Sequence, residues 1–111
     1  MADFSCTTDT SPGMAIVHAA GDIDLATADQ LWEALLAHLI PGTRVVLDCT
    51  GITFCDSTGL RTLIRAHHHA AATGADFALC AIDGPVGELI KLAGTTGLIP
   101  VADPTVTDPQ D

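Results

Sequence analysis

The sequence has little positive charge and few aromatic side chains. Its 111 residues include four Lys and Arg against fourteen Asp and Glu, giving a formal net charge of −10, and they include three Phe, one Trp and no Tyr. A surface of this charge repels phosphate backbones and anionic lipid heads, which argues against nucleic-acid binding and against direct membrane binding. Partners that carry a basic patch are favoured instead.

Long apolar runs and targeting signals are also missing. No stretch approaches the roughly 18 apolar residues of a membrane span, and the start, Met1-Ala2-Asp3-Phe4, has no basic segment followed by an apolar one. We therefore expect a cytoplasmic protein. Hydrophobic residues make up 48% of the chain, a composition that forms a core, and the length predicts one domain.

The four cysteines do not form an obvious disulfide framework. In a cytosolic chain, isolated cysteines within apolar runs are usually small buried hydrophobic residues, which is our prediction for Cys49 and Cys80. Cys55 directly precedes Asp56 at a turn, so a redox role for its thiol stays open.

Apolar periodicity predicts strands that alternate with amphipathic helices. We expect strands at 14–20, 44–49 and 76–82, a strand at 3–8 paired with the first, and a short edge strand at 98–101 that contains Pro100. The first strand is apolar on both faces, and Gly51 should end the second. The predicted fold class is α/β: a mixed β-sheet of about four to five strands covered by amphipathic helices, with right-handed crossovers.

Capping signals predict where three helices begin. Thr27-Ala28-Asp29-Gln30 has the form of a capping box, Ser57 is a candidate N-cap, and Asp83-Gly84-Pro85 opens the third helix. The predicted apolar stripe of the second helix comprises Leu60, Leu63, Ile64, His67 and Ala71. We expect the domain to span residues 1–101, and residues 102–111, which are acidic and lack an apolar pattern, to form a disordered tail.

The turn Asp56-Ser57-Thr58-Gly59 is the most informative segment, because it joins a strand to a helix. An exposed serine there is accessible to a kinase, and phosphorylation adds about −1.5 to −2 charges at the helix N-terminus. Free amides and the helix dipole favour this anion, whereas Asp56 and the overall charge oppose it. We expect a phosphate to change docking rather than to unfold the domain. The alternative interpretation is that Ser57 is only a structural cap.

Asp22 and Asp24 follow the first core strand and should lie near this turn, because the ends of parallel strands align. Asp22, Asp24, Asp56 and Ser57 together form only a weak divalent-metal signal, and the sequence has no nucleotide-binding loop. We predict no metal and no cofactor.

Catalysis is also disfavoured. The Gly-x-Ser-x-Gly elbow is absent, and His67, His68 and His69 point about 100° apart on a helix, so they cannot all bind one ion. His18 is predicted to be a buried, hydrogen-bonded histidine. We therefore expect a protein that is not an enzyme.

The string Phe54-Cys55-Asp56-Ser57-Thr58-Gly59-Leu60 resembles the signature of STAS domains of the anti-sigma factor antagonist type. That signature is a hydrophobic residue, any residue, and then Asp-Ser-Ser/Thr-Gly-Leu. Further resemblance comes from Gly21-Asp22-Ile23-Asp24 with Thr27-Ala28, from Val45-Val46-Leu47-Asp48, and from Leu92…Gly97-Leu98. The resemblance covers roughly residues 3–101 and implies a STAS-like fold.

The resemblance implies a switch protein without catalytic activity. Such an antagonist, when unphosphorylated, binds an anti-sigma factor serine kinase with a histidine-kinase-like ATP fold and releases a sigma factor. The kinase phosphorylates the serine after the Asp, here Ser57 with Thr58 as the alternative, and a PP2C-type phosphatase reverses this. By position, the partner-binding residues are Asp22, Asp24, Asp56, Ser57, Thr58, Gly59, Leu60 and Arg61. The alternative function is a STAS regulatory or scaffold subunit of a membrane transport or sensory complex.

Overall fold

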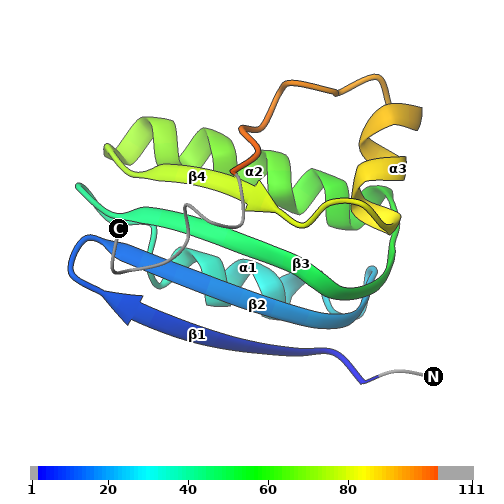
Figure 1. Cartoon of the computed structure of the whole chain (residues 1–111), viewed down its shortest axis with the longest axis horizontal. Coiled ribbons are helices and arrows are strands. Elements are labelled where there is room, and N and C mark those ends of the chain that lie inside the picture. Colours follow the sequence, from blue (N-terminus) through cyan, green and yellow to red (C-terminus); the bar gives the residue numbers. More distant parts are fainter. Residues whose placement is uncertain (1–2, 103–111) are drawn as a thin grey trace.

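Four strands form one mixed sheet in the order β1-β2-β3-β4 (Figure 1). The computed structural model describes residues 3–102. Its strands are β1 Ser5–Ser11, β2 Met14–Ile23, β3 Arg44–Cys55 and β4 Asp76–Cys80. β1 and β2 pair antiparallel across a short turn, whereas β2, β3 and β4 run parallel to one another.

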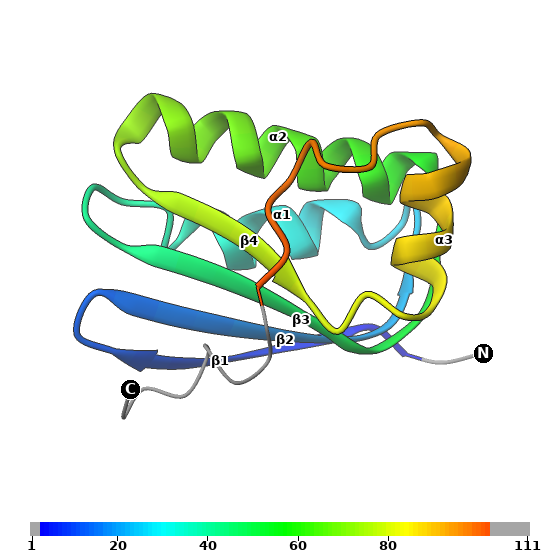
Figure 2. The ribbon, with the colours of Figure 1, turned by 45° about the horizontal axis from the view of Figure 1, so that its top comes forward.

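The helices lie over one face of this sheet (Figure 2). They are α1 Ala28–Leu36, α2 Ser57–Thr73 and α3 Pro85–Leu92. α1 and α2 lie side by side and run roughly along the strands, and α3 lies near the end of the sheet where α2 begins. Within residues 3–102 no helix covers the other face, which we call the open face. This arrangement confirms the predicted α/β fold with a mixed sheet. No helix of the described residues is long and apolar enough to cross a membrane.

The core fills the space between the sheet and the helices. Its largest fully buried side chains include Leu47 from β3, Leu31 and Leu35 from α1, and Leu63 from α2. Burying each leucine stabilises the fold by about 1.5–3 kcal/mol. Because the helices cover only one face, residues of β2 alternate between buried and half-buried. The strand is largely apolar on both faces, but the expectation that follows, that helices cover both faces, is wrong.

Gly51 does not end β3, contrary to the prediction, and the strand continues to Cys55. Two steps along β2 from His18 to Ala20 correspond to three steps along β3 from Asp48 to Gly51, so β3 carries an extra residue here. A β-carbon on Gly51 would lie 2.9 Å from the carbonyl oxygen of Ala19. The glycine thus allows the two strands to approach closely at a bulge instead of breaking the strand.

The buried side of α2 is rotated relative to the predicted stripe. Leu60 and Leu63 are buried as expected, but Ala71 is exposed, and Ile64 and His67 are only half-buried. Small residues occupy the remaining buried positions, which are Gly59, Thr62, Ala66 and Ala70. These small residues let the helix pack closely on the sheet, so the buried side of α2 extends from Leu60 and Leu63 toward Ala66 and Ala70 instead of toward His67 and Ala71.

The C-terminal part of the described chain forms a single bridge instead of the predicted strand at 98–101. Val101 pairs with Leu79, whose N–H donates to the Pro100 carbonyl at 2.9 Å and whose carbonyl accepts from the Ala102 N–H at 2.7 Å. Pro100 has no N–H, so the ladder cannot extend toward Phe77. Ala102, which we expected to begin the tail, is buried. The rest of the predicted tail, 103–111, lies outside the described residues.

β4 is also shorter than predicted, since it ends at Cys80 rather than at residue 82. The next residue, Ala81, has a φ of 56°, a left-handed conformation that an extended strand cannot contain.

Candidate partner-binding site

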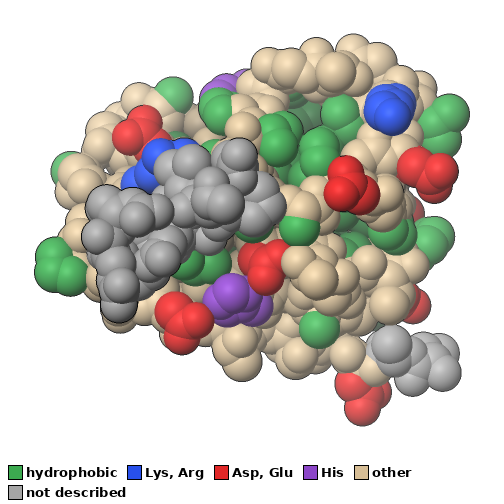
Figure 3. Space-filling model, in the orientation of Figure 1, with side chains coloured by type: hydrophobic (Ala, Val, Ile, Leu, Met, Phe, Trp, Pro, Cys, Tyr) green, Lys and Arg blue, Asp and Glu red, His purple; other side chains and the backbone are tan. Residues whose placement is uncertain are grey.

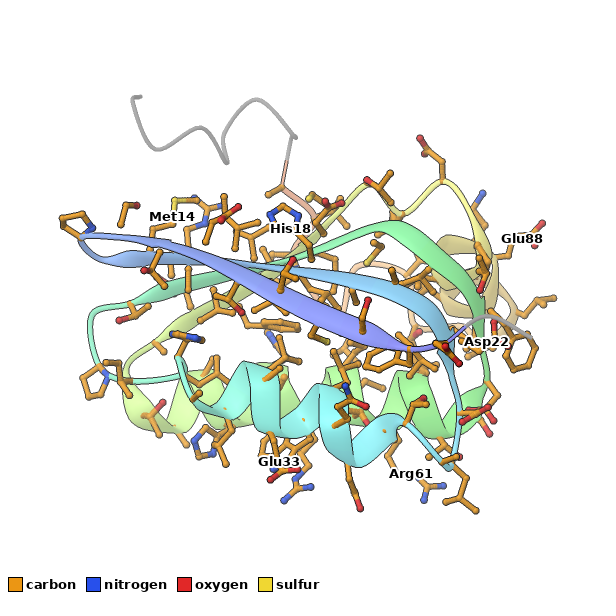
Figure 4. The ribbon with its side chains drawn as sticks, turned by 90° about the horizontal axis from the view of Figure 1, so that it is seen from below. Met14, His18, Asp22, Glu33, Arg61 and Glu88 are labelled. Atoms are coloured by element: carbon orange, nitrogen blue, oxygen red, sulfur yellow. The ribbon has the colours of Figure 1, made fainter. Side chains whose placement is uncertain are left out.

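The carboxyl ends of β2 and β3 place the predicted site residues at one end of the sheet. Asp22 pairs with Phe54 in the parallel ladder, and the Thr53 hydroxyl donates to Asp22 Oδ1 at 2.6 Å. The Asp56 N–H donates to the Ile23 carbonyl at 3.2 Å, which ties the start of α2 to the end of β2. Figure 4 shows Asp22 and Arg61 at this same end of the molecule. The strand-end argument therefore placed Asp22 correctly beside the Asp56 turn.

The Asp24 turn is held by a network that differs from the predicted capping box. The Thr27 hydroxyl accepts from the Asp24 N–H at 3.0 Å and donates to the Asp22 carbonyl at 2.8 Å. It makes no cap hydrogen bond to the first turn of α1, so the capping-box prediction is wrong. Asp24 Oδ1 accepts from the Ala26 N–H at 2.9 Å. Asp24 thus shapes the turn while its half-buried carboxylate remains at the surface.

Asp56, and not Ser57, is the N-cap of α2. Its Oδ1 accepts from the Thr58 N–H at 2.9 Å and the Gly59 N–H at 3.1 Å, and its backbone is extended. A carboxylate at this position also interacts favourably with the helix dipole. Our prediction that Ser57 caps the helix is wrong. The amides of the first turn that we expected to receive a phosphate are already occupied by the carboxylate.

Ser57 is the first residue of α2 and is exposed. The next residue, Thr58, is half-buried, and its carbonyl accepts from the Thr62 hydroxyl at 3.1 Å. Ser57 is therefore more accessible to solvent than Thr58.

Gly59 and Leu60 of the predicted set lie inside the molecule. A β-carbon on Gly59 would come within 2.6 Å of Cys55 Sγ and 2.7 Å of Ile23 Cγ2, distances that real side chains do not adopt. Leu60 is 7% exposed and belongs to the core. These two residues therefore position the helix start, while Asp22, Asp24, Asp56, Ser57, Thr58 and Arg61 reach the surface.

Two large apolar side chains near the Asp56-Ser57 turn are exposed to solvent. Leu25, between β2 and α1, is 81% exposed, and Phe54, at the end of β3, is 49% exposed. Exposed large apolar residues beside charged groups are typical of protein interfaces. Leu25 was not predicted to be a functional residue, although an apolar residue next to Asp22 and Asp24 in a turn is a signal of an exposed contact. Phe54 was noted only as part of the family signature.

The cysteine thiols are not arranged for reactivity. Cys49, Cys55 and Cys80 are buried, which confirms the prediction for Cys49 and Cys80. Burial, with a smaller effect from the Asp56 carboxylate, raises the pKa of Cys55 to about 11. Because the thiolate is the reactive form, this environment argues against a redox role for Cys55.

The histidines are spread over both sides of the molecule. His18 is hydrogen-bonded as predicted, but its side chain is 40% exposed on the open face, so the prediction that it is buried is wrong. On the helical side, the His69 ring packs edge-on against Trp32, and Arg65 stacks over the same indole at 3.9 Å. Within residues 3–102, no three His, Cys, Asp or Glu side chains are grouped to hold a metal ion.

Comparison with known proteins gives consistent results. The STAS domain model matches residues 5–108. BtrV of Bordetella bronchiseptica, a protein named as an anti-sigma factor antagonist, is 31% identical over 98 residues, covering 87% of this chain and 84% of that protein. The anti-sigma F factor antagonist of Paenibacillus polymyxa is 28% identical over 95 residues, covering 82% of this chain and 80% of that protein. The crystal structure of an anti-sigma factor antagonist from Mycobacterium paratuberculosis superposes with a TM-score of 0.74 at 25% identity, covering 96% of this chain and 90% of that one.

Proposed function

The chain belongs to the STAS domain family, and from this premise we propose that it is an anti-sigma factor antagonist. In this function it is not an enzyme: it binds an anti-sigma factor and so releases a sigma factor in the cytoplasm. The names of BtrV and of the Paenibacillus polymyxa relative support this function. The observation that carries the proposal is the exposed Ser57 hydroxyl beside the Asp56 cap.

The proposed partner is an anti-sigma factor serine kinase with a histidine-kinase-like ATP fold. It binds the unphosphorylated chain, phosphorylates Ser57 (with Thr58 as the alternative acceptor) and then dissociates. A PP2C-type phosphatase restores the serine. The exposure of Ser57 and the half-burial of Thr58 support this choice of acceptor.

The charge around Ser57 supports the direction of the switch. The Asp56 carboxylate already accepts from the Thr58 and Gly59 amides, so a phosphate on the adjacent residue finds those donors occupied. In a complex that buries Ser57, this dianion would lose hydration without gaining hydrogen bonds from these two amides. A loss of about 2–3 kcal/mol weakens affinity by roughly thirty- to two-hundredfold, enough for a switch at ordinary protein concentrations.

The proposed docking surface combines the acidic residues of the site with the two exposed apolar side chains. Leu25 and Phe54 provide the apolar contact, and Asp22, Asp24 and Asp56 favour a partner whose patch is rimmed by Lys and Arg. We assign residues 1–101, together with the buried Ala102, to the STAS domain and residues 103–111 to an acidic tail.

Phosphate mapping tests the proposal. The wild-type chain, Ser57→Ala and Thr58→Ala are incubated with ATP and host lysate, and phosphate is located by mass spectrometry. We expect phosphate on Ser57 in the wild type and in Thr58→Ala, and none at this turn in Ser57→Ala. Absence of phosphate from Ser57, with a lysate active on another substrate, would reject the phospho-switch.

A further inference from the structure

A histidine lies between two carboxylates on the open face of the sheet. His18 Nδ1 is 2.7 Å from Asp48 Oδ2 on β3, and its Nε2 is 3.0 Å from Asp9 Oδ2 on β1. Figure 4 shows His18 projecting from β2 on the side away from the helices, and Figure 3 shows a histidine between acidic side chains on this face. We call Asp9, His18 and Asp48 the histidine–carboxylate cluster; it links three adjacent strands.

The two contacts favour the protonated form of the ring. An ionised carboxylate only accepts hydrogen bonds, so both contacts are hydrogen bonds at the same time only when both ring nitrogens donate, as in the imidazolium. A neutral ring would direct one nitrogen lone pair at a carboxylate oxygen. The hydrogen bond to Asp48, opposed by partial burial and assisted by Asp9, raises the pKa of His18. Partial burial raises the pKa of Asp48, but hydrogen bonds from Thr50 and His18 outweigh it and lower the pKa overall.

The cluster lies where the β2–β3 ladder changes register. The extra residue of β3 follows Asp48 directly, between the pairs His18–Asp48 and Ala20–Gly51. Asp48 Oδ1 accepts from the Thr50 N–H at 3.0 Å and from its hydroxyl at 2.6 Å. One oxygen of Asp48 therefore holds the bulge, and the other holds His18.

Among residues 3–102, the remaining groups around His18 are neutral or more distant. We call a set of residues that pair with one another across the four strands a row. The row that contains His18 on the open face also contains Thr7, Asp48 and Cys80. Asp9 comes from the next row, beside Ile16 and Val46, and Arg44 and Asp76 lie one row further along. Burial, with a smaller effect from Asp48, raises the pKa of Cys80, so its thiol is neutral near pH 7. Within this described part of the chain, Asp9 and Asp48 are thus the charges that His18 meets directly.

We propose that protonated His18 holds β1 and β2 against the β3 bulge through its hydrogen bonds to Asp9 and Asp48. Deprotonation at higher pH removes one of these hydrogen bonds and makes the bulge more mobile. This bulge and a second register shift, between the pairs Gly21–Ile52 and Asp22–Phe54, together set the alignment of the strand ends downstream, where Asp22 and Asp56 lie. The cluster is therefore a pH-dependent control of the geometry of that end of the sheet. It stands on contacts of the chain itself and does not depend on any partner.

The pH window follows from the direction of each shift. Because the folded-state pKa of His18 is raised, its stabilisation is fully present below the unfolded value of about 6.5 and is lost as pH rises through the folded value. Because the pKa of Asp48 is lowered, its contribution is present above its unfolded value and is lost as pH falls through the folded one. The cluster therefore stabilises the fold most between these two limits, in mildly acidic to near-neutral solution.

NMR titration of the intact chain tests the proposal. We expect the His18 ring to titrate above about 6.5, and its midpoint to fall in Asp9→Asn and to fall further in Asp48→Asn. The amides of Gly51 and Ile52, corrected for intrinsic exchange, should exchange several-fold faster above the midpoint than below it. The control Asp76→Asn removes a carboxylate from the same face, two rows away, and should leave the midpoint unchanged.

Asp9 is 82% exposed, so Asp9→Asn keeps the fold and remains informative if Asp48→Asn disturbs the bulge. A midpoint at or below the ordinary histidine value in the wild type would overturn the proposal. So would a midpoint that Asp9→Asn leaves unchanged, or bulge amides whose protection does not follow the His18 titration.

Discussion

Single residues decide what the Asp56-Ser57 turn can do. Asp and Ser are both good N-caps, and they are adjacent here, so the sequence could not distinguish which of them caps α2. The choice depends on the extended backbone of Asp56, which directs its carboxylate toward the Thr58 and Gly59 amides. The consequence is functional: with Asp56 as the cap, the Ser57 hydroxyl is not required by the helix and is available for modification.

This division of roles predicts different costs for substitution at adjacent positions. Asp56→Ala leaves two amides without their acceptor and should lower the free energy of unfolding by about 1 kcal/mol, within roughly 0.5–2. Ser57→Ala should change it by less than about 0.5 kcal/mol, as expected for an exposed position. Urea unfolding measures both. Equal losses in the two variants would show that Ser57 shares the capping role.

Gly59 is predicted to tolerate no side chain. Gly59→Ala places a methyl group against Cys55 Sγ and Ile23 Cγ2, and such overpacking should destabilise the fold by about 1–3 kcal/mol. The double variant Gly59→Ala/Cys55→Ala removes one of the two clashes and should recover part of this loss in urea unfolding. A Gly59→Ala chain as stable as the wild type would contradict the packing described at the start of α2.

At the scale of helices and strands, hydrophobic patterns in the sequence predicted the order of the elements. Packing determined where β3 bulges and which side of α2 is buried. Alternating strands and helices predicted the mixed sheet, and the alignment of strand ends predicted that Asp22 lies beside the Asp56 turn. The β3 bulge at Gly51 was not predictable, because a glycine in a strand signals a break and a bulge equally. The rotated stripe of α2 was missed for a similar reason: Ala66 and Ala70 pack closely because they are small, and large apolar residues drew the prediction away from them.

The periodicity of α2 also predicts where a phosphate on Ser57 would go. Arg61 is four residues later on the same helix and exposed, and within residues 3–102 it makes no salt bridge. Since residues four apart are neighbours on a helix, the guanidinium should pair with the phosphate and contribute about 0.2–0.5 kcal/mol.

A chain carrying phosphoserine at 57 tests this pairing by ³¹P NMR. The second phosphate pKa should rise in Arg61→Gln and change less in Arg61→Lys, which keeps the charge. An unchanged value in Arg61→Gln would contradict the pairing. The test does not require a kinase.

At the scale of the whole molecule, the net charge of −10 and the two exposed apolar residues predict how a partner binds. Long-range charge mainly sets the association rate, whereas apolar anchors set the dissociation rate. The charge was evident from the sequence. The exposure of Leu25 depends on the geometry of its loop, and that of Phe54 depends on the register of β3, and no sequence pattern specifies either.

Substitutions should separate these two contributions. Phe54→Ala and Leu25→Ala should accelerate dissociation of the anti-sigma factor about five- to thirtyfold, as expected for a loss of roughly 1–2 kcal/mol at an apolar anchor. Higher salt should slow association of the wild type and of both variants alike. Surface plasmon resonance measures both rates. Apolar variants that dissociate like the wild type would place the interface elsewhere. The exposed Ile40, which lies just before β3 at the opposite end of the sheet, provides the control position.

The central claim is that a phosphate on Ser57 separates this chain from its anti-sigma factor. Calorimetric titration of the anti-sigma factor with the unmodified chain, with Ser57→Ala and with the chain carrying phosphoserine at 57 tests it most directly. We predict nearly equal affinities for the first two and roughly thirty- to two-hundredfold weaker binding for the third. Equal affinity for the phosphorylated and unmodified chains would contradict the claim.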